Sequence, residues 1–209
     1  MFSLQTMFGK GDKFYSLLEA SAQASREGAM ALQGLVEQRS EAPTLDGFRA
    51  ARRREKQLAA QISEALVNTF VTALDREDIE AMSFALYRIP KTIEKFAERY
   101  AIVSPRMQDI DFASRATLLM RATEVVVEMV GELRKGLRID TMKQMQDRLQ
   151  AIESEADRLL LEPYRTLYMA GGDPIHVLLA KDLFEMIEKA IDRCRDVGNV
   201  IYSIALKNS

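Results

Sequence analysis

Apolar residues recur along the whole chain with the spacing of amphipathic α-helices, and no stretch pairs strand-like alternation with hairpin turns. In the first stretch, for example, Leu18, Leu32 and Leu35 fall on one loose helical face. The pattern predicts six helices, which cover residues of about 13–38, 45–72, 75–100, 110–135, 140–168 and 174 to near the C-terminus.

Residues that favour helix ends separate these stretches. Asp75 is a candidate N-cap, with Asp78 three residues later in an arrangement like a capping box. Asp173 followed by Pro174 is the usual chemistry of a helix start. Pro90 lies inside the third stretch, where proline is expected to kink the helix or to end one segment.

The order of these stretches predicts the architecture. Each half of the chain holds three long helices, and a loop at residues 101–111 lies almost at the midpoint. Long helices with short connections pack as antiparallel neighbours. We therefore expect an all-α fold of two tandem three-helix bundles, at residues 1–102 and 103–209, which are related by internal duplication and could share a continuous core.

Composition and charge narrow the classes of function. The chain of 209 residues is 47% hydrophobic and 29% charged, with a formal net charge of -2, so nothing drives it as a whole toward nucleic acid or an anionic membrane. A single cysteine, Cys194, suits a reducing compartment. No secretory signal or membrane-spanning run is visible, and a cytoplasmic location without membrane insertion is expected.

The last predicted helix carries a stripe of acids. Glu188, Asp192 and Asp196 repeat every four residues and flank the apolar face of that helix. In isolated helices, like charges at this spacing repel one another by an energy on the order of a few tenths of a kcal/mol per pair. We therefore expect a nearby positive charge to compensate these carboxylates.

The fifth predicted helix offers a matching pair of acids, Glu153 and Asp157, at the same spacing of four. Two such pairs on neighbouring antiparallel helices would place four carboxylates around one pocket, which suits a hard metal ion. The alternative is that nearby basic residues neutralise these acids as ordinary ion pairs. The candidates for that role are Arg158, Lys189, Arg193 and Arg195.

Four segments of the chain resemble a known family. They read MFGKGDKFYSLLE (residues 7–19), DREDIEAM (75–82), IESEADRL (152–159) and IEKAIDRCRDVGNVI (187–201), and they resemble the PhoU-like family, specifically its Pit-accessory branch. The resemblance implies two tandem three-helix bundles whose Glu/Asp-x-x-x-Asp motifs bind multinuclear metal clusters. It also implies a cytosolic regulator of inorganic phosphate uptake that works beside a phosphate transporter of the Pit type.

Carried over to this chain, the family pattern assigns the metal-binding acids to the second bundle. They are Glu153, Asp157, Glu188 and Asp192, and Asp196 extends the motif by one turn. The ions would be divalent or trivalent, and iron and zinc both suit the pattern. The first bundle departs from it, because Arg52, Lys56, Tyr87 and Lys91 stand near the positions of the family's acids. A register one turn away would leave only Glu94 and Glu98, so one metal site is expected.

Enzyme chemistry finds no support in the sequence. His176 is the only histidine, so a di-iron site with two Glu-x-x-His motifs is excluded, and no nucleophile has a paired histidine. Cys194 falls on an apolar face and is expected to be buried and inert. The basic run at residues 51–56 is expected to be a solvated face or to pair with Glu94 and Glu98.

No catalytic residue is therefore assigned, and two functions stay open. One is a metal-binding accessory or regulator of phosphate transport. The other is a metal-free helical adaptor whose acids are salt-bridged and whose exposed faces bind a protein partner. A homo-oligomer is compatible with either function.

Overall fold

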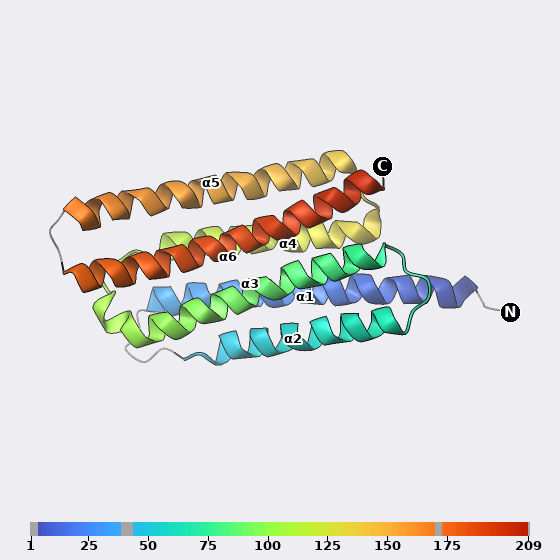
Figure 1. The fold of residues 1–209 in the computed structure, drawn as a ribbon, viewed down its shortest axis with the longest axis horizontal. Coiled ribbons are helices and arrows are strands. Elements are labelled where there is room, and N and C mark those ends of the chain that lie inside the picture. Colours follow the sequence, from blue (N-terminus) through green and yellow to red (C-terminus); the bar gives the residue numbers. More distant parts are fainter. Residues whose placement is uncertain (1–3, 39–43, 170–172, 209) are drawn as a thin grey trace.

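The structure is a computed structural model that describes residues 4–38, 44–169 and 173–208. Six α-helices and two short 3-10 turns make up this part of the chain, which contains no strand (Figure 1). The helices are α1 (Leu4–Gln38), α2 (Asp46–Val67), α3 (Arg76–Val103), α4 (Ala113–Glu132), α5 (Ile139–Met169) and α6 (Pro174–Lys207). The turns η1 (Ser104–Arg106) and η2 (Leu133–Lys135) follow α3 and α4.

All six predicted helices are present, and two of their ends differ from expectation. α1 begins at Leu4, well before residue 13. Gly9 and Gly11 lower the helix propensity of its first turns but do not break the helix. α2 ends at Val67 rather than near residue 72. There Asn68 closes the helix, since both its backbone N–H and its side-chain amide donate to the carbonyl oxygen of Glu64.

One of the two predicted helix caps is present, and the internal proline does not interrupt its helix. Asp173 caps α6 as expected, and its carboxylate accepts a hydrogen bond from the backbone N–H of Ile175 at 3.0 Å. Asp75 precedes α3 but makes no side-chain cap. Asp78, the other member of the predicted capping box, is paired with Lys207 near the end of α6 at 2.5 Å. α3 runs unbroken through the buried Pro90, so the proline does not end the helix.

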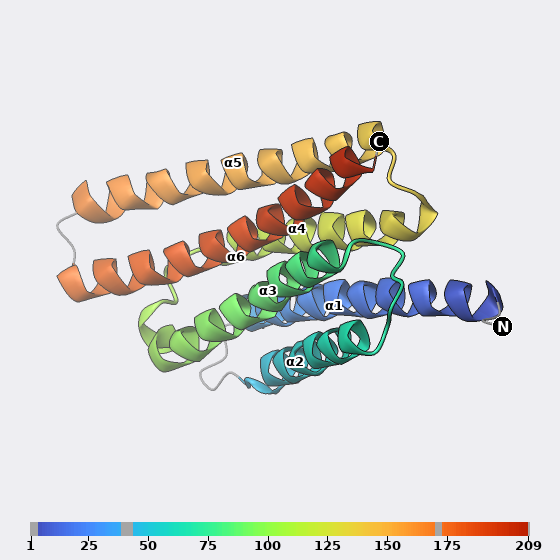
Figure 2. The same ribbon diagram turned by 45° about the vertical axis from the view of Figure 1, so that its right-hand side comes forward.

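The helices form an elongated bundle in which α6 occupies a central place. It lies between α5 and α3, and both views place α2 at the opposite edge from α5 (Figures 1 and 2). α3 packs against α6, and α1 packs against α4, so the two halves of the chain meet along their lengths. This arrangement gives α6 two flanks, one against α5 and one against α3.

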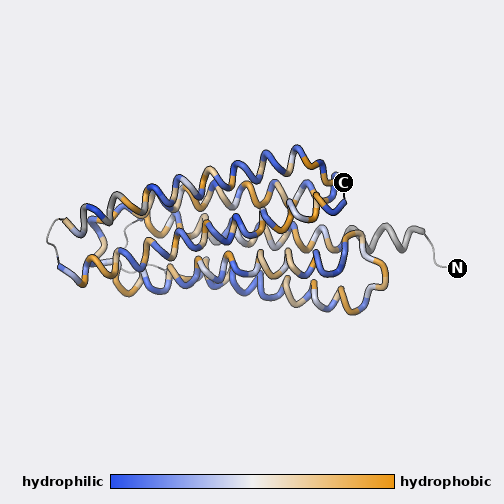
Figure 3. Tube along the Cα trace, turned by 45° about the horizontal axis from the view of Figure 1, so that its top comes forward, coloured by the Kyte–Doolittle hydropathy of each residue, from blue (hydrophilic) through white to orange (hydrophobic). Residues whose placement is uncertain are grey.

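A single hydrophobic core runs through both halves. Hydrophobic and hydrophilic positions alternate along each helix with the helical period (Figure 3). Where the halves meet, the ring of Phe112 lies 5.8 Å from Phe96, 5.5 Å from Tyr100 and 5.1 Å from Phe184, measured between ring centroids. Two bundles that share such contacts have one common core. Among the described helices, none is both long and apolar enough to cross a bilayer.

Candidate functional site

Antiparallel packing of α5 and α6 brings two pairs of acids together. Glu153 and Asp157 come from α5, and Glu188 and Asp192 come from α6; we call these four residues the acidic cluster. Burial, together with the negative charges of Asp192, Asp157 and Glu153, raises the pKa of Glu188 to about 7. The structure thus places all four carboxylates within one electrostatic neighbourhood.

One arginine enters this cluster. Arg195 lies beside Glu153, with its Nη1 atom 2.5 Å from one carboxylate oxygen and 2.7 Å from the other. Burial raises the pKa of Glu153, the Arg195 guanidinium opposes that change, and the hydrogen bond with Asp192 adds to it. Seven residues separate Arg195 from Glu188, so helix geometry returns it to within about 20° of the same direction. Arg195 is one of the four basic residues that the sequence indicates as candidate partners, and the spacing alone does not single it out.

The other three acids of the cluster have no basic partner. Within the described part of the chain, Asp157, Glu188 and Asp192 each lack a lysine or arginine at ion-pair distance. Four carboxylates therefore face a single guanidinium. Burial is the main cause of the raised pKa of Glu188, and the neighbouring carboxylates Asp192, Asp157 and Glu153 add to it.

Asp196 lies on the other flank of α6. Its carboxylate accepts from Arg193 at 2.6 Å and from Arg88 of α3 at 3.4 Å. A spacing of four residues advances the direction of a side chain by about 40° around a helix, so two such steps carry Asp196 about 80° away from Glu188. The structure therefore does not bring this predicted ligand to the other four acids.

The side chains of the acidic cluster are suitable metal ligands, but they are not grouped closely enough to hold an ion as they stand. Carboxylate oxygens are the ligands of hard cations, and the unbalanced charge favours a cation. Among the described residues, however, no three Asp, Glu, His or Cys side chains are grouped so that they could hold a metal ion. Both oxygens of Glu153 are engaged by Arg195, so a metal would have to displace that contact.

The close approach of α5 to α6 beside the cluster depends on Gly198. A Cβ atom added there would lie 2.5 Å from Oε1 of Gln146 and 2.5 Å from Cδ1 of Leu149. The Gln146 amide also donates to the side-chain oxygen of Asn199. The absence of a side chain at Gly198 thus allows the two helices to meet at this distance.

Within the described residues, the corresponding region of the first bundle has no acidic cluster. The guanidinium of Arg52 lies 4.0 Å over the ring of Tyr87 and donates to its hydroxyl, and its Nε atom is 3.9 Å from Glu94. The Arg52 hydrogen bond, aided by the charges of Lys91 and Lys56, lowers the pKa of Tyr87. A cation–aromatic contact is therefore found at two of the positions near which the resemblance implied acids, and one expected ion pair of the basic run, Arg52 with Glu94, is present.

Sequence reasoning missed Glu55, a buried acid of the first bundle. It has no exposed surface, and Ser21 donates a hydrogen bond to its Oε1 atom at 2.5 Å. Burial raises its pKa, the Ser21 hydrogen bond and nearby arginines only partly offset this, and the resulting pKa is about 7. The available signal was position: Glu55 precedes Leu58 by three residues and Ile62 by seven, which places it on the apolar face.

The lone histidine and the lone cysteine lie outside the cluster. His176 has its Nε2 atom 3.2 Å from the Asp109 carboxylate. Cys194 is fully buried, as expected, and burial raises the pKa of its thiol far above the usual range. Neither adds a ligand or a nucleophile to the acids.

Comparison with solved structures decides the fold. A PhoU-like protein from Shewanella oneidensis MR-1 superposes with a TM-score of 0.81 over 93% of this chain and 99% of its own, at 16% sequence identity. The chain has the PhoU-like fold. A second PhoU-like structure from the same organism gives a TM-score of 0.80 at 17% identity. No protein-family model matches the chain.

Sequence relatives extend this PhoU-like assignment. The "UPF0111 protein YkaA" of Bacillus subtilis (strain 168) is 26% identical over 148 residues, which are 69% of this chain and 70% of that protein. The "Putative pit accessory protein" of Rhizobium meliloti (strain 1021) is 20% identical over 201 residues, or 94% of each chain. The resemblance to the PhoU-like family and its Pit-accessory branch is thereby confirmed.

Proposed function

We propose that this protein is a cytoplasmic, non-enzymatic accessory or regulator of inorganic phosphate transport of the Pit type, and that the acidic cluster binds a metal ion between α5 and α6. Similarity along 94% of the chain to a protein named for a pit accessory role supports the transport part. The observation that carries the metal part is the excess of four carboxylates over one arginine at the junction of the two helices.

The chain's own residues define what such an ion would do. The metal would supply the positive charge that the cluster lacks, and among the described residues Asp157, Glu188 and Asp192 have no competing basic partner. Glu153 would join them by leaving Arg195. Because the acids come from both helices, binding would hold α5 and α6 in a fixed relative position and would stabilise this part of the fold.

The first prediction concerns metal content. Protein purified without a metal-affinity column is expected to hold metal in stoichiometric amounts by elemental analysis, before or after incubation with iron, zinc or manganese. The double variant Glu153→Gln with Asp192→Asn is expected to lose it, because each helix then contributes one carboxylate fewer. The matched control is Asp147→Asn with Glu155→Gln, two acids of α5 that pair with Lys143 and Arg121 instead.

The metal proposal also predicts a stability difference between these proteins. Added metal is expected to raise the midpoint of thermal unfolding of the wild type and of the control. It should not raise that of the double variant Glu153→Gln with Asp192→Asn, which we call the cluster variant. Wild-type protein that holds no metal after all three incubations would contradict the proposal.

The second prediction concerns transport. In cells that take up phosphate only through a Pit-type transporter, deletion of this chain is expected to change the initial rate of radiolabelled phosphate uptake. Re-expression of the wild type is expected to restore the rate, and re-expression of the cluster variant is not. An uptake rate that is the same with and without the chain would contradict the transport role.

A metal-free adaptor is the second candidate function. The Arg195–Glu153 ion pair favours it, because this contact satisfies one acid of the cluster without a metal. In that case re-expression of the cluster variant would restore the uptake rate as the wild type does, and elemental analysis would find no metal in the wild type.

A further inference from the structure

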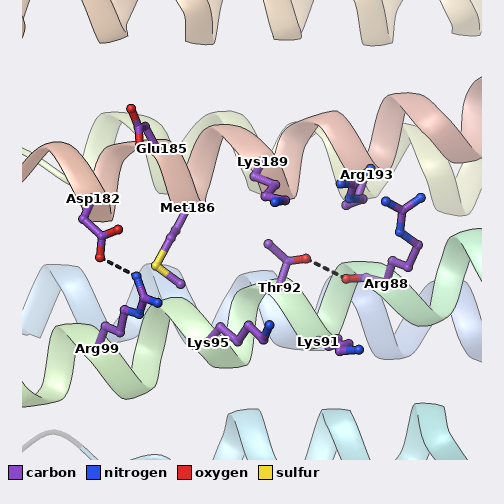
Figure 4. Close-up of a pocket in the computed structure, with 10 residues that line it drawn as sticks. All are labelled: Arg88, Lys91, Thr92, Lys95, Arg99, Asp182, Glu185, Met186, Lys189 and Arg193. Carbon is purple, nitrogen blue, oxygen red and sulfur yellow. Dashed lines mark hydrogen bonds and ion pairs between the residues drawn. The ribbon is translucent and has the colours of Figure 1, made fainter.

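A groove on the other flank of α6 has the opposite charge. It lies between α3 and α6 and has a volume of about 460 Å³. Figure 4 shows Arg88 reaching from α3 toward α6 and Lys189 reaching from α6 toward α3. Six of its lining side chains are basic and two are acidic, and the basic ones are Arg88, Lys91, Lys95, Arg99, Lys189 and Arg193.

The two acids of the groove are already engaged. Asp182 accepts from Arg99 at 2.5 Å, which neutralises one end of the groove. Glu185 pairs with Lys181, which is not a lining residue, and in Figure 4 it points away from the groove. Neither carboxylate is directed at the three lysines.

The remaining basic side chains are left without enough counter-charge. Lys91, Lys95 and Lys189 are exposed, and none of them has a carboxylate at ion-pair distance in the described part of the chain. Arg88 and Arg193 share the single carboxylate of Asp196. Five cations against one anion are held in one place by two packed helices, which is the arrangement of a site for a multivalent anion.

We propose that this groove, which we call the basic groove, binds a small molecule or short chain that carries two or more adjacent phosphate groups. A phosphate monoester group carries a charge of roughly −1.5 to −2 at neutral pH, so the net four positive charges match about two such groups. The stripe from residue 88 to residue 99 spans about 16 Å of helix, too long for one phosphate ion to contact. Arginine and lysine together are the usual donors to phosphate oxygens.

This inference does not rest on the proposed function. The acidic cluster is formed by residues of α5 and α6, and the basic groove by residues of α3 and α6. Figure 1 shows α6 between α5 and α3. Loss of the carboxylates in Glu153→Gln with Asp192→Asn leaves every groove residue in place. Binding at the groove and metal binding at the cluster can therefore fail separately.

The test uses isothermal titration calorimetry on the full, metal-free chain with inorganic tripolyphosphate as the probe. Orthophosphate and citrate are the comparison anions, since citrate carries similar charge on carboxylates. We expect tripolyphosphate to bind at least about tenfold more tightly than either. The Lys91→Gln with Lys189→Gln variant should weaken that binding by at least about tenfold, because two charge-assisted contacts are lost.

Two further proteins complete the test. Lys13→Gln removes an exposed lysine of α1 outside the groove, and it should bind tripolyphosphate as the wild type does. Glu153→Gln with Asp192→Asn should bind tripolyphosphate at least as tightly as the wild type does, because it keeps every groove residue and removes two nearby negative charges. The proposal is overturned if citrate or orthophosphate binds as tightly as tripolyphosphate, or if the lysine double variant binds normally. Circular dichroism checks that the variants are folded, which is expected because both lysines are exposed.

Discussion

At the scale of single residues, the buried acid Glu55 gives the stability of the protein a dependence on pH. An ordinary glutamate has a pKa of 4.5, whereas burial raises that of Glu55 to about 7. Between these two values the unfolded chain loses this proton while the folded chain keeps it. The contribution of Glu55 to stability is therefore intact below pH 4.5, declines as the pH rises, and is lost above about pH 7.

Glu55→Gln is the test of this behaviour. A glutamine resembles the protonated acid, so the variant should gain up to about 3 kcal/mol in free energy of unfolding at pH 8 and little at pH 4.5. Urea denaturation at both pH values measures this. The control is Glu64→Gln on the exposed side of the same helix, which should change little at either pH. An equal effect of Glu55→Gln at both values would contradict the assignment.

Residue patterns predict the acidic cluster better than they predict its ion pairs. Two Glu-x-x-x-Asp spacings on consecutive helices are visible in the sequence, and the structure brings those four acids together. Whether Arg195 contacts Glu153 depends on the rotation of α6 and on a side-chain rotamer, which spacing does not encode. Glu55 was missed because its three arginine neighbours made the segment read as a solvated face.

At the scale of elements, the contact between α5 and α6 is set by one missing side chain. Gly198 lies opposite Gln146 and Leu149, and a methyl group there would overlap the ends of both side chains. A glycine inside a helix usually costs stability relative to alanine, by roughly 0.5–1 kcal/mol. Here close packing explains why the glycine is tolerated.

Two glycine substitutions separate these effects. Gly34→Ala in α1 meets no atom within 4 Å, so it should stabilise the protein by roughly 0.5–1 kcal/mol. Gly198→Ala should forfeit that gain and cost about 1–3 kcal/mol through overpacking, so its free energy of unfolding should fall below that of the wild type. Guanidinium denaturation compares the two. Equal stabilisation by both changes would show that α5 and α6 have room to adjust.

Helix periodicity predicts the elements well and their ends less well. The six apolar stretches are long, so each helix is found where its period indicates. The ends depend on competition between local contacts: Asp78 pairs with Lys207 from the far end of the chain, and no capping-box pattern near Asp75 could show that. Long-range partners are the part of the fold that local sequence lacks.

At the scale of the whole molecule, the shared core implies that both bundles unfold together. Phe112 stands between aromatic rings of α3 and α6, and its removal would leave a cavity between the halves. Phe112→Ala should lower the free energy of unfolding by about 3–5 kcal/mol in a single transition. Phe70→Ala, at a fully exposed phenylalanine, should change it by less than about 0.5 kcal/mol.

Far-UV and near-UV circular dichroism during denaturation measure this cooperativity. Coincident curves are expected for the wild type and for Phe112→Ala. Two separated transitions would show that each bundle is stable alone, as two independent cores would allow.

The opposite charges on the two flanks of α6 make that helix a shared boundary. A cation held on the α5 side would offset the acids there, and an anion held on the α3 side would offset the lysines, so each ligand would change the field in which the other binds. Thermodynamic reciprocity then requires that whatever factor one ligand imposes on the affinity of the other is returned in full. With both sites occupied as proposed, the fraction of protein that holds one ion would depend on the concentration of the other.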